Sequence, residues 1–224
     1  MTSTFSRRTT CRACSAREPR LFLDLGETAL ANAFLRDPSE FASEPRFPLQ
    51  VYFCESCSLV QLLDVVPPEQ LFSNYIYVTG TSDTIAAHNQ RYAESVVGLL
   101  ALRRSDLVVE VASNDGSLLA CFQTHGVRVQ GVEPAANIAA SASERGVPTL
   151  NRFFGHEEGV RLRAELGPAK AVIGNNVLAH VDDTQGFLRG ARELLADDGR
   201  AIFEVPYLGD FVERLEYDTV YHEH

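Results

Sequence analysis

The amino-acid sequence predicts an α/β protein in which a small β and loop module precedes a domain built on a mainly parallel sheet. Four of the five cysteines form two Cys-x-x-Cys pairs, both before residue 60. From residue 107 onward, apolar strand-like runs alternate with helix-like segments, the pattern of a parallel sheet covered on both faces. The length of 224 residues also exceeds that of a usual single domain. We therefore expect a cysteine-bearing module at 1–80 and an α/β domain at 81–224.

The composition narrows the class of protein. A hydrophobic content of 45% and a charged content of 22% are those of an ordinary globular protein. No apolar run approaches 18 residues, and the N-terminus has no apolar signal core, so we expect no membrane contact and a cytoplasmic location. A net charge of −10 argues against nucleic acid as a partner. The short basic pairs Arg7-Arg8 and Arg103-Arg104 are interpreted as solvated surface.

The paired cysteines predict a metal site formed by Cys11, Cys14, Cys54 and Cys57. Each Cys-x-x-Cys turn points two sulfurs the same way, and two such turns place four thiolates around a zinc ion at about 2.3 Å. Disulfides are the alternative, but they rarely persist in a reducing cytosol. A redox pair would open a helix after a strand, which neither pair does. We therefore predict structural zinc, and we assign Cys121, in an apolar helical run, to the core.

Between and after the cysteine pairs the sequence predicts short strands and breaks. Residues 21–25 alternate in polarity, and residues 47–53 lead as a strand into Cys54. Pro67-Pro68 then interrupts the chain and begins a short helix.

The larger domain is predicted to alternate strands with helices. Ligands of such sheets bind at the carboxyl ends of the strands. The expected strands cover 107–112, 127–132, 148–150, 169–174 and 200–205, and the expected helices cover 84–103, 117–124 and 184–195, with an alanine-rich helix after Pro134.

Two acidic residues at strand ends predict a nucleoside site. Glu110 opens a turn that ends at Gly116, and Glu133 follows 23 residues later, where a carboxylate can accept ribose hydroxyl protons. A dinucleotide such as NAD would require more glycines, so that its pyrophosphate could approach the backbone. S-adenosylmethionine has no phosphate and is the favoured cofactor, although an ordinary βα turn is the simpler alternative. The predicted cofactor residues are Glu110, Ala112, Asn114, Asp115, Gly116, Glu133, Pro134, Asn175 and Asn176.

Several motifs occur together in an order typical of one enzyme family. They are the two cysteine pairs, Leu25-Gly26-Glu27, Tyr75-Ile76-Tyr77, the turn at 110–116, Gly131-Val132-Glu133-Pro134, Asn176-Val177-Leu178-Ala179-His180 and Tyr221-His222-Glu223-His224. This combination resembles the zinc-binding nucleotide-sugar C-methyltransferases of deoxysugar biosynthesis, which methylate C3 of 4-keto-6-deoxy sugars. The resemblance implies a Rossmann-like methyltransferase sheet with strand order 3-2-1-4-5. Ala112 departs from the glycine common at that position, and the family's C-terminal domain, expected after His224, is absent here or supplied by a partner.

The resemblance also implies roles for the remaining polar residues. A ketone at C4 acidifies the hydrogen on C3, so the enzyme requires a general base there and donors near the enolate oxygen. His224 is the predicted base, and Glu223 is expected to bind the sugar or orient an imidazole. Tyr221 and Tyr75 are expected to supply hydroxyl donors, with Tyr77 as the alternative to Tyr75. His180 follows the fourth strand at the carboxyl edge, whereas His88, His125 and His156 are interpreted as surface or structural residues.

Other functions remain open at this point. The closing Tyr-His-Glu-His tetrapeptide is also a candidate metal cluster. A small-molecule O- or N-methyltransferase, or a truncated S-adenosylmethionine-binding module that is inactive without a partner domain, fits the cofactor residues as well. The leading hypothesis has a nucleotide-linked keto sugar as substrate.

Overall fold

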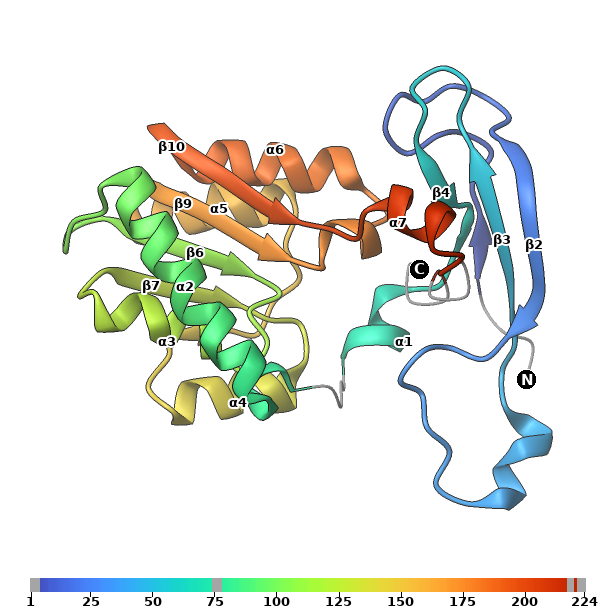
Figure 1. Cartoon of the computed structure of the whole chain (residues 1–224), viewed down its shortest axis with the longest axis horizontal. Coiled ribbons are helices and arrows are strands. Elements are labelled where there is room, and N and C mark those ends of the chain that lie inside the picture. Colours follow the sequence, from blue (N-terminus) through green and yellow to red (C-terminus); the bar gives the residue numbers. More distant parts are fainter. Residues whose placement is uncertain (1–4, 74–77, 217–219, 221–224) are drawn as a thin grey trace. The chain divides into compact units, whose positions relative to one another are not determined.

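The computed structural model describes residues 5–73, 78–216 and 220. The chain divides into two compact units (Figure 1). The first unit comprises Met1–Leu71, Ala179–Gln185 and Pro206–His224, and the second comprises Phe72–Leu178 and Gly186–Val205. The predicted domain bounds of 1–80 and 81–224 stay a prediction. Within the described ranges, no helix is long and apolar enough to cross a membrane.

The first unit is built on short antiparallel strands. β2 (Arg20–Thr28), β3 (Phe47–Phe53) and β4 (Val60–Leu62) form one sheet, and β1 (Ser6–Arg7) pairs with β5 (Asp64–Val65). Alternate residues of β3 are buried, and β3 occupies the residues predicted for a strand. A small core joins Leu49, Val51 and Leu62 to Val220, so the chain returns to this unit near its end.

Helical segments in and beside this unit are short. They are the 3-10 helices η1 (Pro38–Ser43) and η3 (Leu178–His180), α1 (Pro68–Phe72) and α7 (Leu208–Glu213). The helix predicted after Pro67 is therefore present as α1, with proline at a helix start, where its missing N–H costs no hydrogen bond.

The second unit is a five-stranded parallel sheet. Its strands are β6 (Leu107–Val111), β7 (Arg128–Val132), β8 (Thr149–Leu150), β9 (Ala169–Asn175) and β10 (Leu195–Glu204). Their spatial order is β10-β9-β6-β7-β8, and every neighbouring pair is parallel. Numbered within this sheet alone, that order is 5-4-1-2-3, which confirms the predicted Rossmann-like arrangement.

Helices cover both faces of this sheet (Figure 1). They are α2 (Asp83–Leu100), the 3-10 turn η2 (Thr79–Thr81) before it, α3 (Ser117–Thr124), α4 (Ala136–Glu144), α5 (His156–Leu166) and α6 (Thr184–Leu194). On one face, Val96 of α2 and Phe122 of α3 pack against Val108 and Ile173 of the central strands. Helices α5 and α6 meet so closely that a Cβ at Gly159 would lie 2.2 Å from the Gly190 carbonyl oxygen.

Two elements differ from the prediction. Helix α5 was not expected, because its sequence HEEGVRLRAEL is largely charged and its apolar side is narrow. Strand β10 begins at Leu195, five residues before the expected start at Arg200, with an irregular register between these two positions. The turn-forming residues around Gly199 fall in this irregular stretch, between the pairs Leu195–Ala169 and Arg200–Ala171.

Candidate functional site

The four predicted metal ligands lie together in the first unit. The sulfur atoms of Cys11, Cys14, Cys54 and Cys57 all lie within 4.8 Å of one another. The Cys11–Cys57 and Cys14–Cys54 sulfur pairs are each 3.6 Å apart. Tetrahedral zinc with sulfur at about 2.3 Å requires sulfur–sulfur separations of about 3.8 Å. The donor set therefore fits zinc, as the spacing predicted.

The two cysteine turns have the same local geometry. Ser15 N–H donates to the Cys11 carbonyl at 2.9 Å, and Ser58 N–H donates to the Cys54 carbonyl at 2.8 Å. Both serines have φ near 62°, in the left-handed region that closes such a turn. Burial disfavours the Cys11 thiolate, but hydrogen bonds from backbone N–H groups and from Gln61 lower the Cys11 pKa to about 6. The thiolate is the form of cysteine that binds a metal ion.

The predicted cofactor turn lies at the carboxyl end of β6. Ala112, Asn114 and Gly116 have φ of 55°, 47° and 74°, so the backbone passes three times through the left-handed region. Gly116 N–H donates to the Ser113 carbonyl at 3.0 Å, and α3 begins directly afterward. This winding turns the chain sharply at the strand end.

Glu133 joins the end of β7 to this turn. Its carboxylate accepts Asn114 N–H at 2.9 Å and Ala135 N–H at 2.8 Å. Burial raises the Glu133 pKa, and the two N–H donors oppose that shift. Each oxygen retains a further lone pair, so the carboxylate can still accept a ribose hydroxyl. Strand β7 and the turn lie close together, because a Cβ at Gly131 would lie 2.5 Å from the Ser113 hydroxyl.

Two backbone N–H groups just before α2 donate hydrogen bonds to side chains of the turn. The sequence did not predict these two contacts. Thr79 N–H donates to Asn114 Oδ1 at 2.9 Å, and Gly80 N–H donates to Asp115 Oδ2 at 3.1 Å. Arg145 forms an ion pair with Asp115 at 2.8 Å. Although burial opposes the Asp115 carboxylate, Arg145 and the Ser117 donors lower its pKa. Asp115 thus links the turn to Gly80, Ser117 and Arg145 through hydrogen bonds and an ion pair.

Four buried polar atoms near this turn have no hydrogen-bond partner among the described residues. They are Glu110 Oε2, Ser113 Oγ, Asn175 Oδ1 and the Tyr92 hydroxyl. Burial, with the charges of Asp115 and Glu133, raises the Glu110 pKa well above its ordinary value. Burial and the nearby Glu110 and Glu204 raise the Tyr92 pKa to about 12. Buried polar groups are normally paired, so these atoms point to a polar ligand.

Tyr92 was missed because it falls at an apolar position of the helical pattern in α2. The remaining cofactor candidates lie at strand ends in the same unit. Asn175 ends β9 opposite Glu204, and Asn176, with φ of 52°, donates its N–H to the Glu204 carbonyl at 2.8 Å. Pro134 follows Glu133, and its carbonyl accepts the Asn151 side chain at 2.8 Å.

The catalytic candidates are distributed differently. Tyr75, Tyr221, Glu223 and His224 lie outside the described residues. His180 ends η3 and belongs to the first unit, together with the cysteine cluster, whereas the cofactor candidates belong to the second unit. The sequence pattern did not indicate this division, because His180 follows β9 directly along the chain.

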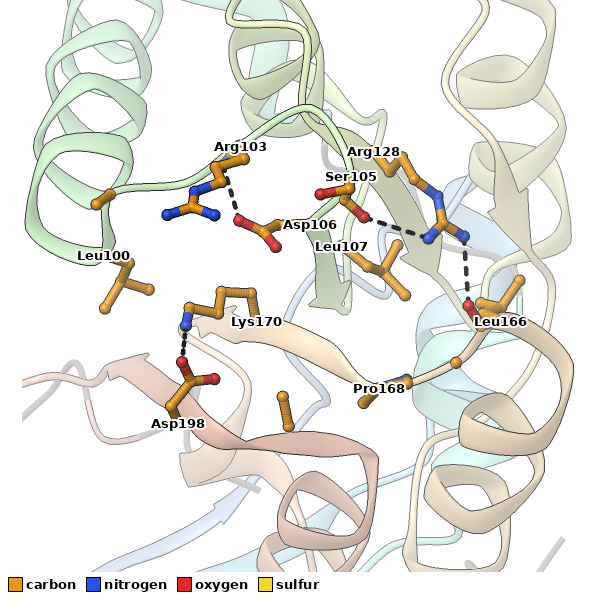
Figure 2. A pocket seen from close by; sticks show the side chains of 13 residues that line it. Leu100, Arg103, Ser105, Asp106, Leu107, Arg128, Leu166, Pro168, Lys170 and Asp198 are labelled. Carbon is orange, nitrogen blue, oxygen red and sulfur yellow. Dashed lines mark hydrogen bonds and ion pairs between the residues drawn. The ribbon is translucent and has the colours of Figure 1, made fainter.

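A cavity of about 570 Å³ is lined by none of the predicted cofactor residues (Figure 2). Its lining includes Leu107, Arg128 and Lys170, which stand at the starts of β6, β7 and β9. Two of its cations are already engaged: Lys170 pairs with Asp198, and Arg128 donates to the Leu166 carbonyl at 3.3 Å. Ligands of parallel α/β sheets bind at the opposite, carboxyl ends of the strands. We therefore do not assign the cofactor to this cavity.

Comparison with known proteins gives the family. Residues 11–72 match a family model described as "Putative zinc binding domain", and residues 85–224 match one described as "Methyltransferase domain". C-methyltransferase NovU of Streptomyces niveus is 37% identical over 214 residues, which are 96% of this chain and 51% of that protein. The chain thus spans about half the length of this curated relative.

Solved methyltransferases resemble parts of the fold. The CcbJ methyltransferase of Streptomyces caelestis has 23% identity and a TM-score of 0.42, with 51% of this chain and 47% of that chain covered. Magnesium protoporphyrin IX methyltransferase of Synechocystis PCC 6803, solved with bound SAM, has 19% identity and a TM-score of 0.39, with coverages of 50% and 57%.

The family matches agree with the two cofactors that the sequence predicts, S-adenosylmethionine in a methyltransferase domain and zinc in the domain before it. They also confirm the predicted enzyme class and the resemblance to C-methyltransferases. On the match over 85–224, the chain belongs to the methyltransferase-domain family, and a zinc-binding domain at 11–72 precedes that domain.

Proposed function

We propose that this chain carries the zinc module and the cofactor domain of a C-methyltransferase that acts at C3 of a 4-keto-6-deoxy nucleotide sugar. The observation that carries the proposal is the group of buried, unpartnered polar atoms at the carboxyl ends of β6 and β9 in the described part of the chain. The 37% identity to C-methyltransferase NovU supports methyl transfer to carbon. The sugar substrate comes from the motif resemblance and is the finer part of the proposal.

The proposed cofactor contacts follow from charge and hydrogen-bonding capacity. Glu133 accepts the ribose hydroxyls, because its carboxylate is already fixed by two backbone N–H groups. Glu110, buried and short of a partner, attracts the ammonium of the methionine tail. A cation beside Glu110 would offset the burial that raises its pKa. Ser113 and Asn175 have further unpartnered atoms for the same ligand.

S-adenosylmethionine, when bound, supplies an electrophilic methyl group on a sulfonium. The protein's task is to hold that methyl in line with C3, and orientation of this kind lowers a barrier by up to about 7–11 kcal/mol in the best intramolecular reactions. A general base removes the C3 proton, and the electrons of that bond delocalise into the C4 ketone as an enolate. Bound S-adenosylmethionine, held by Glu133 and Glu110, would supply its methyl group to C3 and would leave as S-adenosylhomocysteine.

We assign the base to His224 and hydroxyl donors to Tyr75 and Tyr221, as the motif resemblance implies. Glu223 orients a neighbouring imidazole or binds the sugar, and His180 provides a second imidazole. Histidine is suited to this role because it titrates near neutral pH. The zinc site takes no part in these steps, since four thiolates leave no open coordination position.

The cofactor assignment is tested by calorimetry with S-adenosylhomocysteine. Glu133→Gln should weaken binding on the order of tenfold, because the amide loses a charge-assisted acceptor. Glu144→Gln, an exposed change on α4, is the matched control and should bind as the wild type does. Equal affinities for the wild type and Glu133→Gln would contradict the assignment.

The reaction is tested by proton exchange. A keto nucleotide sugar incubated in D₂O with the enzyme and S-adenosylhomocysteine should incorporate deuterium at C3, because enolisation precedes transfer. His224→Ala should lose this exchange while its cofactor affinity remains. A small-molecule O- or N-methyltransferase needs no enolising base, so full turnover by His224→Ala would favour that alternative.

A second outcome bears on the part of the relative that this chain does not span. Binding of S-adenosylmethionine without transfer to any keto sugar nucleotide would support a cofactor-binding module that requires a further domain from a partner.

A further inference from the structure

The first cysteine turn contacts a segment more than 160 residues later in the chain. This segment, Ala179–Gln185, belongs to the same compact unit and contains the catalytic candidate His180. Arg12 Nη1 donates to the Val181 carbonyl at 3.2 Å, and Gln185 Nε2 donates to the Ala13 carbonyl at 2.8 Å. The segment is thus hydrogen-bonded to both residues that separate Cys11 from Cys14.

Arg12 is well placed to fix this segment. Its Nη2 donates to the Leu62 carbonyl at 2.5 Å, so one guanidinium joins β4 to the 179–185 segment. Its backbone N–H donates to Gln61 Oε1 at 3.1 Å, and Gln61 in turn donates to Cys11 Sγ at 3.2 Å. The planar guanidinium holds its donors in a fixed arrangement, whereas the three donors of a lysine ammonium rotate about one bond.

Charge strengthens the arrangement. Four thiolates around a divalent ion carry a net charge of about −2, and Arg12 lies between the first two of them along the chain. Arg8 adds an ion pair with Asp182 at 2.8 Å. The Arg8 and Asp182 side chains are partly exposed, so their pair contributes little energy by itself but fixes the direction of the segment. This contact also shows that Arg8 is not simply solvated surface.

We propose that Arg12 is a positioning residue for His180, and that through it the zinc turn holds the segment that carries this imidazole. The proposal rests on the proposed role of His180 in methyl transfer. Zinc binding and the transfer step are then linked through one short path, from Cys11 through Arg12 to Val181. The zinc remains structural and takes no part in bond changes.

The test uses the zinc-loaded full chain with Arg12→Gln. We expect amide hydrogen exchange in residues 181–185 to accelerate about tenfold or more, because hydrogen bonds from a charged donor are lost. We expect kcat to fall on the order of tenfold to hundredfold, since a small displacement of a reacting group has effects of that size. The KM for S-adenosylmethionine and the zinc content should stay unchanged.

Two further variants separate positioning from general damage. Arg17→Gln alters an exposed arginine of the same unit and should change neither exchange nor kcat. Gln185→Ala removes one contact to the turn and should accelerate exchange in 181–185 by a smaller factor, with the fold retained. The pH dependence of kcat should shift in Arg12→Gln, because the environment of an imidazole changes.

Unchanged exchange in 181–185 for Arg12→Gln would overturn the proposal, as would accelerated exchange with an unchanged kcat and pH profile. The exchange measurement needs no substrate. If the wild type transfers no methyl group to a keto sugar nucleotide, the proposed function fails, whereas the contact between the zinc turn and residues 181–185 is still tested by exchange.

Discussion

Ala112 occupies a backbone conformation that glycine adopts more readily. With φ of 55° it lies in the left-handed region, where a Cβ approaches the neighbouring carbonyl oxygen. The turn nevertheless keeps its shape, because Ser113 N–H and Asn114 N–H donate to groups at the end of β7. Alanine therefore replaces the usual glycine here at the cost of local backbone strain.

Ala112→Gly should stabilise the fold by up to about 1 kcal/mol, since relief of the strain exceeds the added freedom of the unfolded chain. Urea denaturation measures the change. Ala120→Gly, within α3, is the matched control and should destabilise by about 1 kcal/mol. A loss of stability in Ala112→Gly equal to that of the control would contradict the strain argument.

Glu110 should make the folded state less stable as pH rises. Burial and neighbouring carboxylates raise its pKa in the folded state, so the folded chain binds more protons than the unfolded chain above about pH 4.3, the ordinary glutamate pKa. Stability then falls by up to about 1.4 kcal/mol per pH unit until the folded-state pKa is reached. Glu110→Gln removes this dependence.

Unfolding free energies at pH 5.5 and 7.5 check the prediction, with exposed Glu144→Gln as the control. The stability of Glu110→Gln relative to the wild type should increase between these pH values, whereas that of Glu144→Gln should not. Parallel pH profiles for the wild type and Glu110→Gln would show that the carboxyl is not perturbed.

Helices α5 and α6 pack at a distance that only glycine permits. Gly159 lies against the Gly190 carbonyl, and a Cβ at Gly190 would lie 2.3 Å from the Gly155 carbonyl. Neighbouring Leu162 and Phe187 are buried in the same layer. The close contact lets both helices cover one sheet face without a gap.

Gly159→Ala should therefore destabilise the protein by about 2 kcal/mol or more, because the backbone of α6 must move. The matched control is Gly98→Ala in α2, where a Cβ would meet no described heavy atom within 4 Å. That change should stabilise by about 0.5–1 kcal/mol through helix propensity. Thermal or urea unfolding of both variants distinguishes the two effects, and a neutral Gly159→Ala would contradict the packing.

Across the molecule, the metal site and the cofactor residues belong to different compact units. The unit with the four cysteines also contains Ala179–Gln185 and Pro206–His224, so loss of the metal should affect segments far from the cysteines in sequence. The cofactor turn is held by contacts within the other unit.

Cys14→Ser combined with Cys57→Ser should abolish zinc binding and accelerate amide exchange in 5–71, 179–185 and 206–216. Affinity for S-adenosylhomocysteine should remain within about threefold, because sites in different compact units without shared partners are nearly independent. Cys121→Ser is the control, since its thiol donates to the Ser117 carbonyl of its own helix and Cys121 is not part of the four-cysteine cluster. Metal analysis, hydrogen exchange and calorimetry report the three quantities, and a joint loss of zinc and cofactor binding would refute the independence of the units.

The sequence by itself determined the features that depend on local spacing and periodicity. Two Cys-x-x-Cys turns specify a four-sulfur cluster because each turn is closed by its own backbone, as the matching Ser15 and Ser58 conformations show. Alternating apolar strands and helices specify a parallel sheet, and the connection rules of such sheets bring Glu110 and Glu133 to one edge.

Only the tertiary structure decided which distant side chains meet. The sequence gives no signal that Arg12 contacts Val181, that Tyr92 lies near Glu110, or that the segment after His180 belongs with the cysteine turns. Helix α5 was missed for the same reason, because its Gly159 contact with α6 stabilises a segment whose own apolar pattern is weak. Such contacts depend on how complete elements pack, which local propensity and residue spacing do not encode.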